Sequence, residues 1–368
     1  MKKVVIGISG GVDSAVAALL LKKQGYEVEG LFMRNWDSML NNEIDGSSPV
    51  GNICPQEEDY NDAVKLCEIL DIKLHRVDFI KEYWDDVFTY FLNELKKGFT
   101  PNPDMLCNKY IKFDLFVKEA NKLGADYVAT GHYANTKNGK LYRAKDENKD
   151  QTYFLADVKK GGFDNILFPL GNITKPEVRK IALDAKLNVA KKKDSTGICF
   201  IGERNFQKFV HNYLQPNPGK IIDVETKKVI GTHEGLMNYT IGQRRHVGIN
   251  GNLERHYVCG KNVKENILYV AFGEDNKYLF SDECIINNVN FISDLRPINC
   301  TAKFRYRDKD HDVILEYLDN NEIRVKYPNM VKSVTPGQAC VLYLGEECLG
   351  CGFIKSVKKD GNELWYLK

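Results

Sequence analysis

The chain has 368 residues and a mass of 42.0 kDa, which is too long for one ordinary hydrophobic core and predicts two or three domains. Hydrophobic residues make up 43% and charged residues 28%, as in a globular protein, and no run of about 18 apolar residues predicts a membrane span. The net charge of +2 excludes a strongly basic nucleic-acid-binding domain, so any RNA binding must depend on local patches. Ten cysteines without a secretory leader predict mostly free thiols, and we expect a cytoplasmic protein.

Strands and helices alternate along the first half of the chain. This alternation predicts an α/β domain with a doubly wound parallel sheet, on which ligands bind at the carboxyl ends of the strands. The expected strands cover residues 2–8, 26–36, 73–79 and 127–134, and the expected helices cover residues 14–25, 59–72, 81–98 and 112–124. A last helix from residue 176 is expected to lead into a short strand and a basic run.

The character of the sequence changes after about residue 203. One helix is expected at residues 202–214, and residues 216–235 have the spacing of a small hairpin. From residue 276 onward, short alternating strands about 8–12 residues apart predict a small barrel or sandwich. We therefore divide the chain into residues 1–203, a small central domain at 204–278 and a C-terminal β-barrel at 279–368.

A glycine-rich turn, SGGVDS at residues 9–14, joins the first predicted strand to the first predicted helix. Glycines let the backbone approach a phosphate closely, and a helix N-terminus offers free N–H groups and a positive dipole end. Ser9 and Ser14 add hydroxyl groups. The turn matches neither the Walker pattern nor the dinucleotide-binding pattern. Two adjacent glycines alone would indicate an ordinary turn, with Asp13 favoured in the first helical turn.

Most of the cysteines are best interpreted as buried packing residues. Cys348 and Cys351 form C-x-x-C within the predicted β-rich region, but a zinc site needs four ligands and no second pair has suitable spacing. A redox pair would need a helix N-terminus, which this region does not supply. The packing interpretation also covers Cys54, Cys67, Cys259, Cys284, Cys300 and Cys340.

Cys107 and Cys199 have different surroundings from the other cysteines. Cys107 follows two prolines near the expected start of a helix, where a thiolate gains from the helix dipole, and Lys109 and Lys112 lie nearby. Cys199 lies in a Ser/Thr/Gly loop behind the basic run 191–193. Two accessible thiols indicate sulfur transfer, in which one carries a persulfide and the other releases the sulfur by forming a disulfide.

The SGGVDS turn resembles the pyrophosphatase loop of ATP-pyrophosphatases, which cleave ATP between the α and β phosphates. Over essentially its whole length the chain resembles the family of bacterial tRNA-specific 2-thiouridylases. The strings that carry this resemblance occur in order: GISGGVDS, MRNWD, TPNPDMLCNKYIKF, ATGHYA, KDQTYFL, DSTGICFIGERNF, GQRRHVGI, FRYR and TPGQACVLY.

The resemblance implies an enzyme, a tRNA-uridine 2-sulfurtransferase. It would adenylate the C2 oxygen of the wobble uridine and replace it with sulfur from a cysteine persulfide, releasing AMP and pyrophosphate. Cys199 would carry the persulfide, Cys107 would complete the transfer, and the two could end in a transient disulfide. Asp104 would accept a proton near the uracil edge, although it could instead cap the following helix.

The resemblance also implies binding residues for ATP, with Mg²⁺ bound together with the nucleotide and no metal site in the protein alone. Residues implied for ATP are Gly7, Ile8, Ser9, Gly10, Gly11, Val12, Asp13, Ser14, Met33 and Gly131. Met33 could equally be a core residue.

Residues implied for tRNA are Asn102, Pro103, Asp104, His132, Lys149, Asp150, Gln151, Arg305, Tyr306 and Gln338. Arg305 could instead lie on a solvated strand face, and residues 279–368 carry 12 basic and 13 acidic side chains, so tRNA contact there would need a local patch. The expected partners are tRNA and a persulfide donor, such as a cysteine desulfurase or a sulfur-relay protein. No membrane partner is expected.

Two other functions are compatible with parts of the sequence. An amide-forming ligase of the ATP-pyrophosphatase group would use the same loop but would need neither Cys107 nor Cys199. An RNA-binding protein with a vestigial loop would retain tRNA without turning over ATP.

Overall fold

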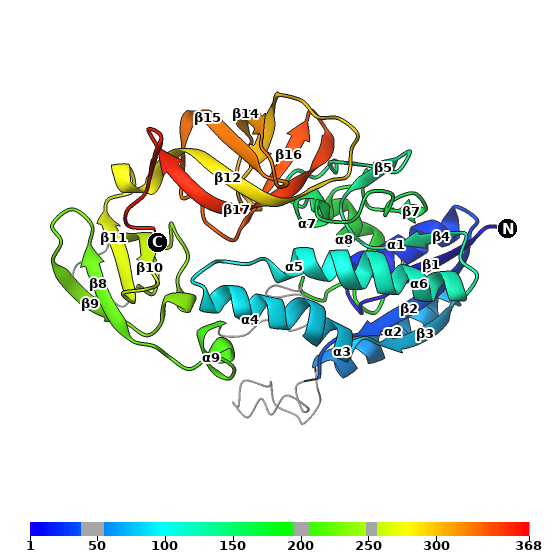
Figure 1. The fold of residues 1–368 in the computed structure, drawn as a ribbon. Coiled ribbons are helices and arrows are strands. Elements are labelled where there is room, and N and C mark those ends of the chain that lie inside the picture. Colours follow the sequence, from blue (N-terminus) through cyan, green and yellow to red (C-terminus); the bar gives the residue numbers. More distant parts are fainter. Residues whose placement is uncertain (38–54, 195–205, 248–255, 368) are drawn as a thin grey trace.

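The computed structural model describes residues 1–37, 55–194, 206–247 and 256–367. Figure 1 shows three parts: a parallel sheet with its helices at the N-terminal end of the colour scale, a small β domain at the opposite side, and a barrel that lies above both. Within the described ranges, no helix has both the length and the apolar character needed to cross a membrane.

The N-terminal part has a five-stranded sheet in the order β3-β2-β1-β4-β7, with every pair parallel. Val4 and Ile6 of the central strand pack into one core cluster and Val5 packs into another, so both faces of the sheet are covered. This arrangement confirms the predicted doubly wound sheet. The strands are β1 Lys3–Gly7, β2 Glu27–Arg34, β3 Lys73–Asp78, β4 Tyr127–Ala129 and β7 Ile166–Leu167.

Helices from different parts of the sequence cover the two faces. One face packs against α1 Val12–Lys23, α2 Pro55–Leu70 and α8 Lys175–Asp184. The other packs against α3 Ile80–Tyr83, α4 Thr89–Lys96, α5 Pro103–Leu106 and α6 Phe116–Lys122, with π-helical turns at Trp84–Phe88 and Cys107–Leu115. Gly25, at φ +84°, follows the end of α1 as the sequence predicted.

The short strand expected after α8 is wrong, because the described residues 185–194 form turns. Leu187 and Val189 are buried against the core beneath α8 and do not extend the sheet. The Arg179 guanidinium donates hydrogen bonds to the carbonyl groups of Ala190 at 3.0 Å and Lys192 at 2.5 Å. The guanidinium group therefore supplies these carbonyls with the hydrogen-bond donors that a neighbouring strand would supply in a sheet.

The middle part begins with α9 Phe206–His211 and contains a four-stranded sheet in the order β10-β11-β8-β9. β8 Gly219–Asp223 and β9 Val229–His233 form the predicted hairpin. β10 His256–Asn262 and β11 Ile267–Phe272 complete the sheet, and β8 pairs with β11 in parallel.

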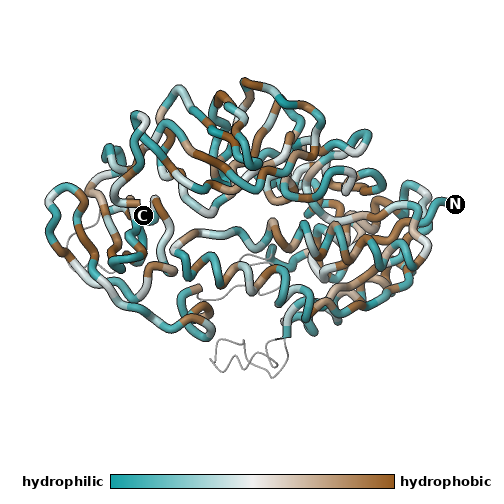
Figure 2. Tube along the Cα trace, viewed as in Figure 1, coloured by the Kyte–Doolittle hydropathy of each residue, from teal (hydrophilic) through white to brown (hydrophobic). Residues whose placement is uncertain are grey.

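The C-terminal part is a closed barrel of six antiparallel strands, because its first and last strands also pair with each other. Figure 2 shows hydrophobic residues along these strands and along the parallel sheet. The strands are β12 Phe280–Phe291, β13 Asn299–Lys303, β14 His311–Tyr317, β15 Ile323–Lys332, β16 Ala339–Leu344 and β17 Glu347–Lys359, and the short β18 Asn362–Glu363 pairs with β17.

The barrel sheet also extends into the N-terminal part. A hairpin of β5 Asn135–Lys137 and β6 Lys140–Tyr142 pairs with β17, with Leu141 opposite Cys348. The core cluster around the parallel sheet includes side chains of β16 and β17, so this joint is packed as a protein interior.

Candidate active site

The predicted phosphate loop lies at the carboxyl end of β1 and leads directly into α1. Gly11 is the N-cap residue of α1 and has no side chain that could accept a hydrogen bond. The first N–H groups of α1 therefore have no capping partner from this residue. The Ser14 hydroxyl donates to the Gly11 carbonyl at 3.1 Å and accepts from the Ser9 backbone N–H at 3.2 Å. These bonds fold the loop around the helix N-terminus, where a phosphate would meet free donors and a positive dipole end.

Two glycines allow other elements to touch this loop. A Cβ atom on Gly131, just beyond β4, would lie 2.8 Å from the Ser14 backbone nitrogen. A Cβ atom on Gly10, at φ +70°, would lie 2.2 Å from the carbonyl oxygen of Asp59 in α2. Met33 lies near the end of β2, at the same edge of the sheet. Its side chain is half-buried against the core cluster on the sheet face opposite α1. The structure thus brings the residues implied for ATP to one edge of the sheet.

The Asp13 carboxylate is held by two side chains from distant parts of the chain. It accepts a hydrogen bond from the Tyr133 hydroxyl at 2.8 Å, and the Lys175 ammonium lies 2.7 and 2.8 Å from its two oxygens. Lys175 lies in the first turn of α8, behind a Thr174–Glu177 capping box. The loop sequence lacks the lysine of a Walker motif. In the folded protein, Lys175 of α8 contacts the loop through Asp13.

Lys175 also contacts Asp194, which is the last described residue before the segment that contains Cys199. Its ammonium lies 2.7 Å from Asp194, and Lys149 lies 2.8 Å from the same carboxylate. Arg179 is a third cation on Asp194. Partial burial raises the pKa of Asp194, but the hydrogen bonds from Lys149 and Lys175 outweigh burial and lower it to about 2. One carboxylate therefore connects the phosphate loop with a residue implied for tRNA.

Sequence reasoning missed Lys175, although a signal for it existed. A cation is disfavoured in the first turn of a helix, so a lysine there calls for an anionic partner. It also missed Asn35, directly after β2. Among the described residues Asn35 is fully buried and neither atom of its side-chain amide has a hydrogen-bond partner, which is costly and makes it a further candidate for ligand contact.

Asn102, and not Asp104, caps the helix that carries Cys107. The Asn102 side chain accepts from the backbone N–H groups of Asp104 at 3.1 Å and Met105 at 3.3 Å, and Pro103 occupies the first helical position. The capping role considered for Asp104 is thus filled by its neighbour.

The expectation of an accessible thiol is wrong for Cys107 in this structure, since its side chain is 0% exposed. The cap at Asn102 puts Cys107 in the second turn, and its side chain belongs to the core cluster that also contains residues of the parallel sheet, β16 and β17. Cys199 lies outside the described residues, as does Cys54. The pairing of Cys107 with Cys199 and their transient disulfide stay predictions.

The helix of Cys107 is anchored to α7 Thr152–Leu155 and the residues that follow it. The Asn108 amide donates to the Phe154 carbonyl at 2.9 Å, and the Lys109 ammonium lies 3.0 Å from Asp157. Burial raises the pKa of Asp157 and Lys109 opposes this effect. Lys109 was expected to favour a thiolate at Cys107, but its charge is already paired with Asp157.

The three consecutive residues implied for tRNA before α7 all make internal contacts. Lys149 pairs with Asp194, as described above. Asp150 is 5% exposed and accepts from the Ala144 N–H at 2.9 Å and the Thr152 hydroxyl at 2.6 Å, and burial raises its pKa. The Gln151 side chain accepts from the Tyr133 N–H at 2.9 Å. In this structure the side chains of residues 149–151 bind other residues of the protein.

His132, also implied for tRNA, is buried beside the phosphate loop. Its Nδ1 atom is hydrogen-bonded to the Thr130 hydroxyl at 2.8 Å, and its ring lies 5.8 Å from Phe113 and 6.1 Å from Phe168 between centroids. Burial lowers the pKa of His132 well below its ordinary value, so the ring is neutral at physiological pH.

Arg305 and Tyr306 lie in the loop between β13 and β14, so the alternative of a strand face for Arg305 is wrong. Strand β13 ends at Lys303, where pairing with β14 and β16 stops. Arg305 is exposed, and the Tyr306 ring lies 4.3 Å from that of Phe154. The Tyr306 ring therefore lies over α7, whose residues contact the helix of Cys107.

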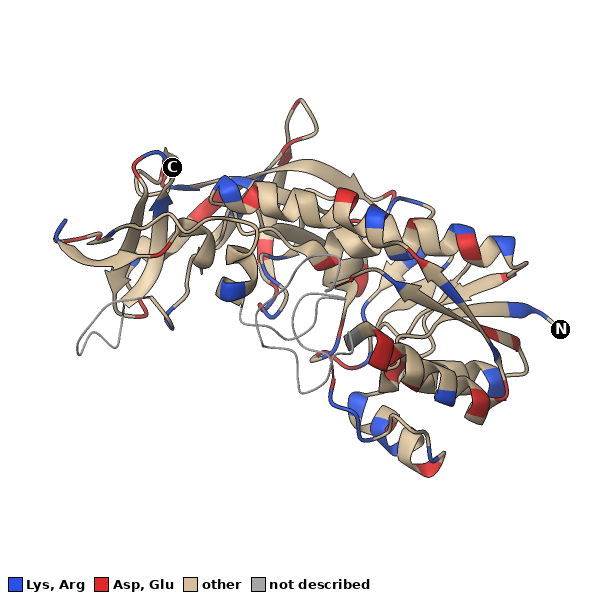
Figure 3. Ribbon diagram, turned by 90° about the horizontal axis from the view of Figure 1, so that it is seen from below, with Lys and Arg blue, Asp and Glu red and all other residues tan. Residues whose placement is uncertain are grey.

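Gln338 lies in the turn before β16, close to the segment that leads to Asn102. The Thr100 N–H donates to the Pro336 carbonyl at 3.2 Å, and the Tyr153 hydroxyl donates to the Ala339 carbonyl at 2.9 Å. The structure therefore gathers residues implied for tRNA from the helix, from α7 and from the barrel around one region. In the ribbon of Figure 3, positions of Lys and Arg are interspersed with positions of Asp and Glu, in agreement with the small net charge.

Cys348 and Cys351 are fully buried in β17, as expected for packing residues. Burial raises the pKa of the Cys351 thiol well above its ordinary value. Across the ranges that the structure describes, no cluster of three His, Cys, Asp or Glu side chains could hold a metal ion.

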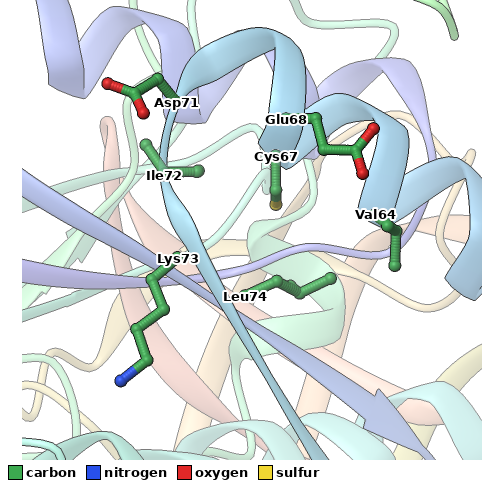
Figure 4. Close-up of a pocket in the computed structure, with 7 residues that line it drawn as sticks. All are labelled: Val64, Cys67, Glu68, Asp71, Ile72, Lys73 and Leu74. Atoms are coloured by element: carbon green, nitrogen blue, oxygen red, sulfur yellow. The ribbon is translucent and has the colours of Figure 1, made fainter.

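The pocket in Figure 4 lies between α2 and β3 and is separate from the site. Cys67, Glu68, Asp71 and Lys73 line it, and Lys73 is the first residue of β3. The pocket is therefore at the amino end of that strand, whereas the phosphate loop lies at the carboxyl edge.

Three family models match the chain in succession. A tRNA methyl transferase HUP domain matches residues 2–203, a tRNA methyl transferase PRC-barrel domain matches residues 207–272, and an aminomethyltransferase beta-barrel domain matches residues 281–354.

Curated relatives match over nearly the whole chain. A tRNA-specific 2-thiouridylase of Mycoplasmopsis synoviae is 54% identical and the match covers 100% of this chain and 99% of that protein. A protein of the same name from Mycoplasma capricolum is 53% identical, with 97% and 100% covered. One from Bacillus cytotoxicus is 50% identical, with 99% and 98% covered.

Proposed function

The chain belongs to the family of tRNA-specific 2-thiouridylases, and from this premise we propose that it converts the wobble uridine of tRNA to 2-thiouridine. ATP adenylates the C2 oxygen, a cysteine persulfide supplies the sulfur, and AMP and pyrophosphate are released. We assign catalysis to residues 1–203 and tRNA contact to the barrel at 279–368, with the central domain at 204–278 between them.

One observation carries the proposal: Asp13, Lys175 and the N-terminus of α1 meet at the carboxyl edge of the parallel sheet, with Gly131 against the loop backbone. The N–H groups and Lys175 are suited to a pyrophosphate group. Gly131 and Met33 lie where adenosine would extend along the same edge. The match to a HUP domain supports the use of ATP.

The oxygen donors of the loop also fit a magnesium ion. Asp13, Ser9 and Ser14 offer the carboxylate and hydroxyl oxygens that Mg²⁺ prefers, and the phosphates of ATP would complete its coordination. When bound, the ion adds positive charge that stabilises the pyrophosphate leaving group. Lys175 would then exchange part of its contact with Asp13 for the phosphates.

The sulfur step follows from the chemistry of the two cysteines. The terminal sulfur of the Cys199 persulfide attacks C2, and the C2–O bond to AMP breaks. The Cys107 thiolate then attacks the inner sulfur of Cys199, which forms the Cys107–Cys199 disulfide and releases the thiolated base. A thiol reductant returns both residues to thiols. Because Cys107 is fully buried here, this step requires a rearrangement around it.

The surrounding residues suit an unpaired base that has left the anticodon stack. Asp104 is the proton acceptor near the uracil edge, beside the cap residue Asn102. The Tyr306 ring, tilted against that of Phe154, can extend the aromatic contact to a base, and the exposed Arg305 can pair with a phosphate. A cysteine desulfurase or a sulfur-relay protein supplies the persulfide.

A nucleoside digest of tRNA after incubation with ATP, Mg²⁺ and a persulfide donor tests the proposal. We expect 2-thiouridine and AMP from the wild type and from Cys67→Ser, whose thiol is remote from the site. Cys199→Ser and Cys107→Ser should yield no 2-thiouridine. AMP without a thiolated nucleoside would favour the ligase, and tRNA retention without AMP would favour a binding protein.

A further inference from the structure

Lys261 in β10 of the central domain is a buried lysine held by a carbonyl group. Its side chain is 4% exposed, and its ammonium donates to the Gly98 carbonyl at 2.9 Å. Among the residues that the structure describes, no carboxylate lies within 4.0 Å of it. Lysines are seldom buried without a counter-charge, because removing an ammonium group from water is costly. Because burial of the Lys261 ammonium group is costly, we expect its contacts to serve a function.

The carbonyl that Lys261 contacts lies just beyond the C-terminus of α4. The last carbonyl groups of a helix lack intrahelical donors and carry the negative end of the helix dipole, so a cation is favoured there. A Cβ atom on Gly98, at φ +80°, would lie 2.5 Å from a Val263 methyl group. The central domain therefore touches residue 98 with both a charged and an apolar side chain.

The barrel holds the same short segment from another direction. The Thr100 N–H donates to the Pro336 carbonyl at 3.2 Å. A Cβ atom on Gly337, at φ +88°, would lie 2.7 Å from the Phe99 Cβ atom and 2.9 Å from the Thr100 nitrogen. Residues 98–100 are thus in contact with both accessory parts of the protein, two residues before the helix cap at Asn102.

We propose that Lys261 is a positioning residue for the helix that carries Asp104 and Cys107. It holds the Gly98 carbonyl from the central domain while the turn at 336–337 holds Thr100 from the barrel, and together they set where that helix begins. The proposal rests on the thiolation function above, in which Cys107 must reach the sulfur of Cys199. It gives the central domain a part in catalysis as well as in the connection between its neighbours.

The test compares Lys261→Met with Lys264→Met, an exposed lysine three residues further along the chain. Methionine fills a similar volume without the ammonium group. In single-turnover thiolation at saturating tRNA and ATP, Lys261→Met should be slower by about tenfold or more, since small misplacements of reacting groups cost this much. Its tRNA Kd should match that of Lys264→Met, and both variants should be fully folded at the temperature of the assay. A thiolation rate equal to that of Lys264→Met would overturn the proposal, as would a slower rate fully explained by weaker tRNA binding or loss of folded protein.

Gly337→Ala provides a second variant if Lys261→Met fails to fold. The added methyl group would press on Phe99 and Thr100 from the barrel side, so the thiolation rate should fall while the tRNA Kd is kept. An unchanged rate in a folded Gly337→Ala protein would contradict the role of this segment. Failure of the wild type to form 2-thiouridine would contradict the proposed function itself and is therefore distinguishable.

Discussion

The carboxyl edge of the parallel sheet and the joint between α4 and the central domain each bury a lysine, in opposite ways. Lys175 is 12% exposed and lies between two carboxylates, Asp13 and Asp194. Lys261 has a carbonyl partner, and burial lowers its pKa to about 7. The comparison shows that the fold places a lysine between two carboxylates at the candidate nucleotide site and a lysine with a lowered pKa at a domain joint.

The largest effect is expected from removing the charge at the sheet edge. Lys175→Met should slow AMP release by about 100-fold or more, because it removes the cation that we propose contacts the pyrophosphate. It also leaves the carboxylates of Asp13 and Asp194 without the ammonium group that lies between them. Lys145→Met, which removes an exposed lysine 3.5 Å from Glu177, should behave as the wild type. Equal AMP release by both variants would show that Lys175 only holds the fold together.

The next largest effect is expected from a steric change at the same edge of the sheet. Gly131→Ala would bring a methyl group within 2.8 Å of the Ser14 nitrogen, so the N-terminus of α1 must shift. We expect a loss of about 1–3 kcal/mol in the free energy of unfolding and a higher KM for ATP. Gly124→Ala is the control for a glycine next to open space, although its φ of +79° adds local strain. A Gly131→Ala protein with an unchanged KM for ATP would contradict the placement of adenosine on this edge.

The joint should show a pH dependence of stability above pH 7, whereas the lowered pKa of Asp194 at the sheet edge affects stability in acid. Between the folded pKa of about 7 and the ordinary value of 10.5, Lys261 binds a proton in the unfolded chain but not in the folded one, so stability rises with pH. The free energy of unfolding of the wild type should rise relative to Lys261→Met by up to about 1.4 kcal/mol per pH unit in this interval. Burial lowers the pKa of the nearby His233, so that residue titrates below the interval. Parallel stability curves for the two proteins above pH 7 would contradict the lowered pKa.

The smallest effect is expected at the helix cap beyond the joint. Asn102→Ala should cost about 1 kcal/mol and slow thiolation, because two backbone N–H groups lose their acceptor. Asn102→Asp retains a capping oxygen and should regain the lost stability. If Asn102→Asp is stable but still slow, the amide itself contacts the base; if both variants thiolate normally, the residue serves only the fold.

The parallel sheet and the turn that leads into α1 could be predicted from sequence because their signals are local. β-branched runs end at glycines, and SGGVDS follows the first strand directly, so the carboxyl edge of β1 was identifiable. The barrel was equally accessible from its short alternating strands. In each case the pattern that specifies the element lies within the element itself.

The rest depends on contacts between distant residues. Lys175 meets Asp13 across 162 positions, and no motif joins them. Cys107 is buried in a core cluster that also includes side chains of β16 and β17, and the sequence of its own helix does not reveal these distant members. The strand expected after α8 was wrong because one arginine, Arg179, satisfies the carbonyls from outside the segment.

The pairing of the β5–β6 hairpin with β17 has a consequence for synthesis of the protein. Lys140 and Glu347 form an ion pair across 207 positions, so the hairpin leaves the ribosome long before its partner strand exists. Until then its edge offers unpaired backbone groups to other chains, and the core cluster that contains Cys107 lacks its side chains from β16 and β17. The N-terminal half therefore cannot complete this core during translation until β16 and β17, near the end of the chain, have been made.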